Sequence, residues 1–477
     1  MGKFVGFFKC AAIMSAGVSA AAVAVSLGGG TALAAEVKSA HAGQMHLPPP
    51  TSAGSGADQF AEAAVTYTPT NWPYVPPILG DGSDERGGKP AVRPLPIIKS
   101  NFETARWMVS PYYPHPTLGG EAKFRTHCNF SHVANDDPIV APGRPGASHA
   151  HMFFGNTLTN ADSTYESLRT AGGSTCGGGP LNRSAYWFPA VHKDGQGQDG
   201  QPAIIKMDWA TIYYFTREDR RKRLTKLYRG FNFVFGFNPG DPEDLRQKNE
   251  IAAANRIGNY GSYRYGGNGF VGWKCETSNG SNENSPVPLS AMQPYLRNAD
   301  GSATLTCPTT DAIVAAISSP TCWDGKNLSS PDGRSHVRYA IRENNSGLGG
   351  ICPQGWHEIP QLIVLVSFSH QGPDDYKEWY LASDRMNPEK PFLNGQSFHM
   401  DWFGAWDNYT MNRWMINCLG IKVGPYEGNP HSCIDTQFGD NTAGIVQSPA
   451  PDGTRTPQID LKTKWATMGA DRYIPVP

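Results

Sequence analysis

The segment 203–215 constrains the fold most, because it alternates like a β-strand but is largely apolar on both faces. One face carries Met207, Trp209, Thr211 and Tyr213, and the other carries Asp208, Ala210, Ile212 and Tyr214. A strand of this kind needs cover on both sides, which indicates stacked sheets. Similar strand patterns occur at 231–237 and 271–277, and the most apolar run, 359–368, is predicted to be a central buried strand.

The composition agrees with a β-rich fold that contains many turns and aromatic side chains. Of the 477 residues, 53 are Gly and 39 are Pro, while 11% are aromatic and only 17% are charged. We therefore predict a mainly β fold, a β-sandwich of jelly-roll type with long disulfide-tied loops and a few short helices. The formal net charge of −1 leaves no broad basic surface, so nucleic-acid binding is not expected.

The N-terminus has the pattern of a secretory signal peptide. Lys3 and Lys9 flank an aromatic stretch, an Ala- and Val-rich run follows, and Ala32-Leu33-Ala34 provides an A-x-A cleavage site. A membrane anchor is the alternative, but three glycines break the run, and no later stretch is long and apolar enough to span a membrane. We expect a secreted protein.

The rest of the chain divides by composition into three parts. After the signal peptide at 1–34, residues 35–96 are rich in Pro, Gly, Ala and Ser and are predicted to be a disordered leader. A β-rich domain is expected at 97–437, and residues 438–477 are expected to form a loosely structured tail that contributes little to the core.

Eight cysteines remain after the predicted signal peptide, and an even number in an exported chain favours disulfides. They are Cys128, Cys176, Cys275, Cys307, Cys322, Cys352, Cys418 and Cys433. We expect pairing between neighbours along the chain, with Cys418 and Cys433 as the most favourable local pair. A thiolate metal site is the alternative, but the sequence contains no Cys-x-x-Cys pair.

The segment 136–156 carries the clearest chemical motif. His149 and His151 stand two apart in a strand-like run, so their side chains are expected to point the same way. Together they can converge on a proton, a ligand or a metal ion. With Gly143 they match the opening of the cupin metal motif, although the glutamate expected shortly after the second histidine is absent.

Two later segments also carry histidine at expected strand ends or turns. The stretch 335–341 is predicted to be a strand that carries His336. His399 and Asp401 stand two apart just before a short helix with an apolar stripe. Histidine can exchange a proton near neutral pH, and aspartate can fix its tautomer or act as the companion acid or base.

Aromatic and polar side chains near these motifs are candidates for substrate binding. Tyr186 and Trp187 suit stacking on a sugar ring, although such residues are also ordinary core residues. A turn at Asp324 carries two further polar candidates, Lys326 and Asn327.

The ordered motifs resemble the DUF1996 family, a domain of unknown function found in secreted bacterial and fungal proteins and sometimes joined to WSC carbohydrate-binding modules. The matching motifs are Asp137-Pro138-Ile139-Val140 with Pro142-Gly143, His149-x-His151, Tyr186-Trp187-x-Pro189, Cys322-Trp323-Asp324-Gly325-Lys326-Asn327-Leu328, Ser335-His336-Val337-x-Tyr339, Cys352-Pro353, Ile359-Pro360-Gln361, and His399-x-Asp401 with Trp406-Asp407. Two departures stand out. The family commonly has a histidine where this chain has Gly333-Arg334, and Gly-Asp where this chain has Ser383-Asp384.

Export, aromatic richness and this resemblance together predict a secreted enzyme, a glycoside hydrolase or a polysaccharide lyase, that acts on extracellular polysaccharide or the cell wall. The catalytic candidates are His149, His151, His336, His399, Asp401 and Asp137. Asp137 and Asp401 could divide acid and base work on a glycosidic bond. Two alternatives stay open, a non-catalytic carbohydrate- or wall-binding protein and a metal protein. No cofactor is assigned, and a divalent metal ion would bind at His149 and His151.

Overall fold

The structure is a computed structural model that describes part of the chain. The described residues are 90–98, 121–217, 224–239, 271–276, 296–297, 303–304, 307, 312–340, 352–372, 375–389, 391–421, 432–434 and 472–477. All of them belong to the compact unit Gln44–Pro477. The predicted signal peptide, most of the predicted leader and most of the predicted tail lie outside these residues.

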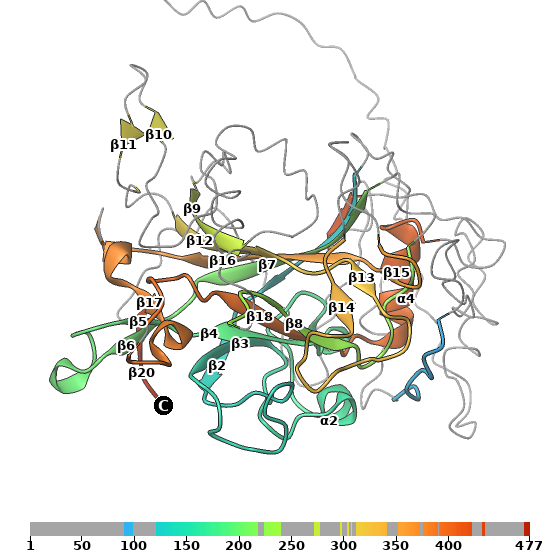
Figure 1. Cartoon of the computed structure of the whole chain (residues 1–477), viewed down its shortest axis with the longest axis horizontal. Helices are drawn as coiled ribbons and strands as arrows, with labels where there is room; N and C mark the ends of the chain where they lie inside the picture. The colour runs from blue at the N-terminus through green and yellow to red at the C-terminus, as the bar shows by residue number, and fades with distance from the viewer. Residues whose placement is uncertain are drawn as a thin grey trace, which may run out of the picture. The chain divides into compact units, whose positions relative to one another are not determined.

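Two large sheets lie one above the other in Figure 1. The six-stranded sheet has the order β19 (Ser432–Ile434), β1 (Glu121–Cys128), β7 (Trp209–Arg217), β16 (Gln361–Phe368), β12 (Ala312–Ser318) and β9 (Val271–Glu276). The five-stranded sheet has the order β2 (Phe130–Ala134), β3 (His151–Gly155), β4 (Ala185–Pro189), β18 (His399–Phe403) and β8 (Asn232–Gly236). Neighbouring strands are antiparallel, except that β1 and β19 are parallel. The predicted mainly β, sandwich-like fold is confirmed.

Smaller sheets and short helices accompany these two sheets. A four-stranded sheet contains β17 (Tyr380–Leu381), β5 (Val191–Lys193), β6 (Ala203–Ile205) and β20 (Tyr473–Pro475), and a three-stranded sheet contains β14 (Val337–Arg338), β13 (Cys322–Trp323) and β15 (His357–Glu358). β10 (Leu296–Arg297) pairs with β11 (Ala303–Thr304). Among the described residues, the helices are α2 (Tyr165–Thr170) and α4 (Asn408–Asn417), with short 3-10 turns η2 (Gly179–Leu181), η3 (Gln198–Gly200), η7 (Asp375–Glu378) and η8 (Ala382–Arg385).

The core between the two large sheets is dominated by aromatic side chains. The five-stranded sheet contributes Met152, Phe154, Tyr186, Phe188, Phe233, Phe235, Met400 and Trp402, all of them almost fully buried. Tyr214 of β7 meets them from the other sheet, and its hydroxyl lies 2.7 Å from the Tyr186 hydroxyl and accepts a bond from Trp406 Nε1. These contacts fix the spacing of the sheets and leave the opposite face of β3, β4 and β18 outside the sandwich.

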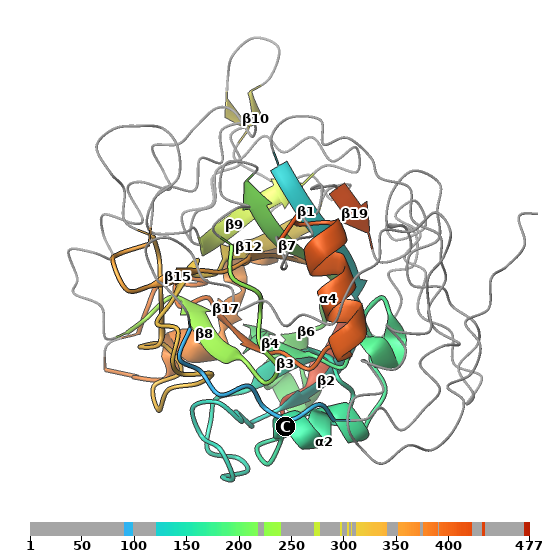
Figure 2. The same ribbon diagram turned by 90° about the vertical axis from the view of Figure 1, so that its right-hand side faces the viewer.

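Helix α4 lies beside the sandwich near β1 and β19 (Figure 2). Asp407 caps its N-terminus by accepting a bond from Thr410 N. Its buried Trp414 stacks on Phe124 of β1, with ring centroids 5.0 Å apart, and also contacts Tyr214. The predicted short helix with an apolar stripe is therefore present, and it seals the core beside the edge strand β19.

Two disulfides each join cysteines that are neighbours along the chain. Cys128 is bonded to Cys176, and Cys322 is bonded to Cys352. Cys418, at the end of α4, is also disulfide-bonded. The side chain of its predicted partner, Cys433, lies outside the described residues.

Two predicted strands differ in the structure. The alternating segment 203–215 is divided into β6 and β7, which belong to different sheets. The break falls where Lys206 N donates to Arg472 O and Asp208 N donates to Ser367 O, so the backbone changes partner between sheets. The predicted strand 335–341 is reduced to β14, because the Asp332 carboxylate accepts bonds from Arg334 N and Ser335 N and holds these residues in a turn.

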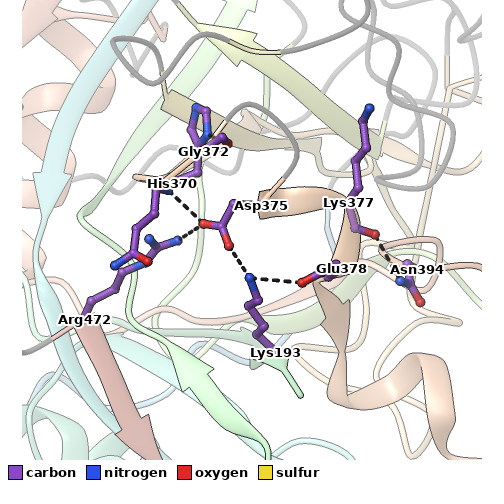
Figure 3. A network of polar contacts seen from close by, with 9 residues as sticks. Lys193, His370, Gly372, Asp375, Lys377, Glu378, Asn394 and Arg472 are labelled. Atoms are coloured by element: carbon purple, nitrogen blue, oxygen red, sulfur yellow. Dashed lines mark hydrogen bonds and ion pairs between the residues drawn. The ribbon is translucent and has the colours of Figure 1, made fainter. Parts of the chain in front are cut away.

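The C-terminal strand β20 is tied to the body of the domain by the polar network in Figure 3. The nearly buried carboxylate of Asp375 pairs with Arg472 at 2.8 Å and with Lys193 of β5 at 2.5 Å. Residues 472–477 lie inside the predicted tail, and residues 91–95 of the predicted leader also bond to the domain. No described helix is long and apolar enough to cross a membrane.

Asp375→Asn should destabilise the protein, because it removes the carboxylate that pairs with Arg472 and Lys193, and only the exposed Glu378, 3.1 Å from Lys193, stays as a counter-charge in this network. Burial raises the pKa of Asp375, but hydrogen bonds from Lys193 and Gln371 and the charge of Arg472 outweigh it and lower the pKa to about 2. The stabilisation is therefore complete above about pH 4 and is lost as the pH falls through 2. We expect about 2–3 kcal/mol lower free energy of unfolding at pH 7, measured by urea denaturation.

Asp194→Asn is the matched control, because Asp194 pairs with Arg385 at 3.0 Å on the surface, where both side chains are about half exposed. An exposed pair contributes less than about 1 kcal/mol. If both variants lose the same free energy of unfolding, the buried network does not stabilise the attachment of β20 to the domain.

Candidate functional site

The histidine motifs meet on the outer face of the five-stranded sheet. Successive side chains of a strand point to opposite faces, so the inward Met152 and Met400 place His151, His399 and Asp401 outward. Asp401 is paired in register with Trp187 of β4, and β4 is in turn paired with β3, where His151 begins the strand. Helix α2 covers part of this face, away from the six-stranded sheet (Figure 1).

Three imidazoles form the centre of the site. Single nitrogen atoms of His149, His151 and His399 all lie within 4.8 Å of one another. The ring centroids of His149 and His151 are 4.2 Å apart, and that of His399 lies 5.3 Å from His149. His151 is fully buried, whereas His149 and His399 are half-buried, so the cluster is accessible from one side.

Two carboxyl groups lie behind the imidazoles. Oxygen atoms of Asp137 and Asp401 lie within 4.8 Å of each other and of a nitrogen of His151. Asp137 is 5% exposed, and its Oδ1 accepts bonds from Ile139 N and Val140 N, both at 2.8 Å. Asp401 is fully buried, and neither of its oxygens has a hydrogen-bond partner among the described residues.

Backbone carbonyls define the tautomers of two histidines. His151 Nδ1 lies 2.9 Å from Asp136 O, and His399 Nδ1 lies 2.8 Å from Ser397 O. A carbonyl oxygen can only accept, so each Nδ1 is the protonated donor, and in a neutral ring Nε2 then carries the lone pair. The Nε2 atoms of His149 and His151 are buried and find no partner in the part of the chain that the structure describes.

Burial and crowding keep the three rings neutral. Burial, followed by repulsion from His151 and His192, lowers the pKa of His149 to about 2. Burial and the neighbouring His399 lower the pKa of His151 to about 3, and burial together with His149 and Arg334 takes the pKa of His399 well below 6.5. At neutral pH the cluster therefore presents unprotonated nitrogen atoms.

Burial shifts the pKa values of the two carboxyl groups upward, opposite to those of the imidazoles. Burial and the charge of Asp137 raise the pKa of Asp401 well above 3.8, although the positive charge of Arg334 opposes this shift. Burial also raises the pKa of Asp137, against its two backbone hydrogen bonds. Both acids would ionise more easily with a cation beside them.

Two further aspartates hold the backbone around the cluster. Asp384 is buried and accepts bonds from Leu381 N, Gly395 N, Ser397 N and the Ser397 hydroxyl. Because the Ser397 carbonyl orients His399, Asp384 positions that ring indirectly. On the other side, Asp136 accepts bonds from Gly146 N and Ala161 N, which shape the loop that carries His149.

The other predicted site residues lie elsewhere. His336 is buried outside the cluster, with Nε2 donating to Asn232 O and Nδ1 bonded to the Ser330 hydroxyl. Tyr186 and Trp187 are fully buried, so neither ring face is available for a sugar in this structure. Asp324, Lys326 and Asn327 form a surface turn in which Asp324 accepts bonds from the other two.

The motif analysis did not identify His192 and Arg334 as neighbours of the site. His192 of β5 lies close enough to His149 to lower its pKa, and its buried Nε2 has no partner within the described ranges. Arg334 is half-buried, and its charge acts on His399, Asp137 and Asp401. The one feature of the sequence that pointed to Arg334 is the departure from the family pattern at Gly333-Arg334, where the family commonly has a histidine.

Comparison with protein families gave one match. A family model described as a domain of unknown function (DUF1996) matches residues 137–406, a segment that contains all three histidines and both aspartates of the cluster. Comparisons with curated proteins and with solved structures found no match.

Gly333→Ala should disturb the wall of the site. Gly333 has φ +65°, and an added Cβ would lie 2.7 Å from Val234 Cγ2 and 2.8 Å from Ile139 Cγ2. Val234 is paired in register with Asp401, and Ile139 N is bonded to Asp137. We expect a loss of about 2–4 kcal/mol in the free energy of unfolding, from backbone strain plus overlap, measured by urea denaturation.

Gly146→Ala separates these two causes. Gly146 has a similar φ of +72°, but its added Cβ would meet nothing within 4 Å. Only the backbone strain remains there, with an expected loss of about 1 kcal/mol. If the two variants unfold at the same urea concentration, tight packing at Gly333 is not important for the site.

Proposed function

The chain belongs to the DUF1996 family, whose model covers residues 137–406 of 477, and we propose that it is a secreted polysaccharide-acting enzyme with its reactive centre at the histidine cluster. The reaction would be hydrolysis or elimination at a glycosidic bond. The partner would be an extracellular polysaccharide or the cell wall, and the signal-peptide pattern supports secretion.

The convergence of His149, His151, His399, Asp137 and Asp401 is the observation that carries the proposal. These residues come from three separated segments, and several of their polar atoms are buried without a partner in the described structure. Native proteins satisfy nearly all such atoms, and the exceptions gather at functional sites. A purely structural role would be expected to resemble that of His336, whose two ring nitrogens are both bonded.

The open side of the cluster determines which groups a substrate would meet. His149 and His399 are half-buried and would contact a polysaccharide chain first, whereas Asp401 lies behind them and is fully buried. This arrangement brings the imidazoles, rather than the two carboxyl groups, next to the substrate, and the carboxyl groups would balance charge from behind.

Recognition of the sugar would depend on polar groups, because Tyr186 and Trp187 are buried. Arg334 is half-buried, its guanidinium donates to Phe237 O at 2.9 Å, and its charge acts on His399 and Asp401. A guanidinium group binds carboxylates well, so this position favours polysaccharides that contain uronic acids.

Purified mature protein should therefore cleave one or more members of a polysaccharide panel that includes polyuronates. Reducing ends report hydrolysis, and absorbance of unsaturated uronates reports elimination. His149→Ala and His399→Ala should each lower the rate by about 100-fold or more, because each removes a group at the reacting centre.

His127→Ala is the matched control. His127 is also half-buried, but it lies on β1 of the other sheet and is bonded to Thr211, so the variant should retain wild-type turnover. Binding of a polysaccharide without turnover, unchanged in His149→Ala, would instead identify a carbohydrate-binding protein and would overturn the enzyme proposal.

A further inference from the structure

We propose that His149, His151 and His399 together bind one divalent transition-metal ion through their Nε2 atoms. The inference deepens the proposed function, because it rests on the same cluster and names its cofactor. Metal binding can be measured without any substrate, so the two proposals can fail separately.

The hydrogen bonds behind the rings have the form expected of metal ligands. His151 and His399 each donate Nδ1–H to a backbone carbonyl, of Asp136 and of Ser397. A metal-binding histidine usually donates its other ring N–H to a carbonyl or carboxylate, which fixes the tautomer and the ring orientation. The lone pairs of both rings are thereby placed on Nε2, the atom that is free to coordinate.

The contrast with His336 supports this assignment. His336 Nε2 donates to Asn232 O, so that atom carries a proton and has no lone pair to offer. The Nε2 atoms of His149 and His151, in contrast, are buried and unpaired as far as the described chain extends. One cation at the meeting point of the three rings would satisfy these atoms together.

Two carboxyl groups lie next to the same cluster. Oxygen atoms of Asp401 and Asp137 lie within 4.8 Å of a nitrogen atom of His151. Their negative charge would balance part of the charge of a bound dication.

The donor set selects the class of metal. Three imidazole nitrogens suit Zn²⁺, Co²⁺, Ni²⁺ or Cu²⁺, whereas Ca²⁺ and Mg²⁺ prefer sites made of oxygen atoms. A site with three protein ligands and one open position is typical of catalytic rather than structural zinc. His149 and His399 are half-buried while the Nε2 atom of His149 is itself buried, so the fourth position would face the side of the cluster that these two residues form.

His399, as the third ligand, would take the place of the glutamate that the cupin-like motif in the sequence lacks. The motif lacks a glutamate shortly after His151, and the structure supplies His399 instead, from β18 on the far side of β4. His149 and His151 therefore do not need a further ligand from their own segment.

The test uses purified mature protein that has been dialysed against a chelator and then freed of it. Isothermal titration with Zn²⁺ should give one ion bound per chain. Co²⁺ should give visible absorption bands that report nitrogen coordination at a site of low symmetry. His149→Ala and His399→Ala should weaken Zn²⁺ binding by about 100-fold, and His127→Ala should bind like the wild type.

Circular dichroism and thermal melting of each variant test whether it is folded. If His399→Ala is unfolded, His399→Gln replaces it, since Gln retains most of the side-chain volume but is a poor ligand. A wild-type protein that binds no Zn²⁺ or Co²⁺, or variants that bind as tightly as the wild type, would overturn the metal site. Tight Zn²⁺ binding without polysaccharide turnover would support the metal site and contradict the proposed function. Polysaccharide turnover that survives removal of metal by the chelator would support the proposed function and contradict the metal site as its cofactor site.

Discussion

The packing of aromatic side chains between the two sheets is the constraint on which the candidate site depends. Tyr186, Phe188, Met400 and Trp402 are locked inward against β7 and β16. Side chains alternate along a strand, so the residues next to these, such as His399 and Asp401, must point to the outer face of the sheet. A slip of one residue in β18 would turn His399 and Asp401 into the core and Met400 and Trp402 out of it. The apolar core therefore determines the register that assembles the histidines.

The outer face is completed by loops, and carboxylates hold these loops in place. Asp136, Asp137 and Asp384 each accept at least two backbone or hydroxyl hydrogen bonds. Asp401 lies among the same elements but accepts none from the described residues. Aspartate therefore has two distinct tasks here: three of these side chains shape the backbone, and one remains available for the chemistry of the site. Sequence motifs do not distinguish these tasks, because the difference lies in the direction of each side chain.

Local periodicity made part of this arrangement predictable. Apolar residues on both faces of the segment 203–215 predicted stacked sheets, and the spacing of His149 and His151 predicted their convergence. The alternation could not show that β6 and β7 separate, because the pattern continues across the break and only the partners of each half differ. It also could not show which histidines meet. His399 lies in the cluster because β18 is the neighbour of β4 in the sheet. His336 lies elsewhere because the turn at Asp332 places its ring against Asn232 O. The residue type of Tyr186 and its place near the histidine motif favour sugar binding, but packing between the two sheets buries it.

The unpaired polar atoms of the cluster are the physical basis of the proposed cation site. A buried polar atom without a partner costs about 1–3 kcal/mol. The Nε2 atoms of His149 and His151 are buried and lack partners in the described structure, and a cation held by the imidazoles would satisfy both together. Asp137 and Asp401, within 4.8 Å of His151, would then balance part of its charge without being ligands. The site therefore combines imidazoles that can coordinate with carboxyl groups that can compensate.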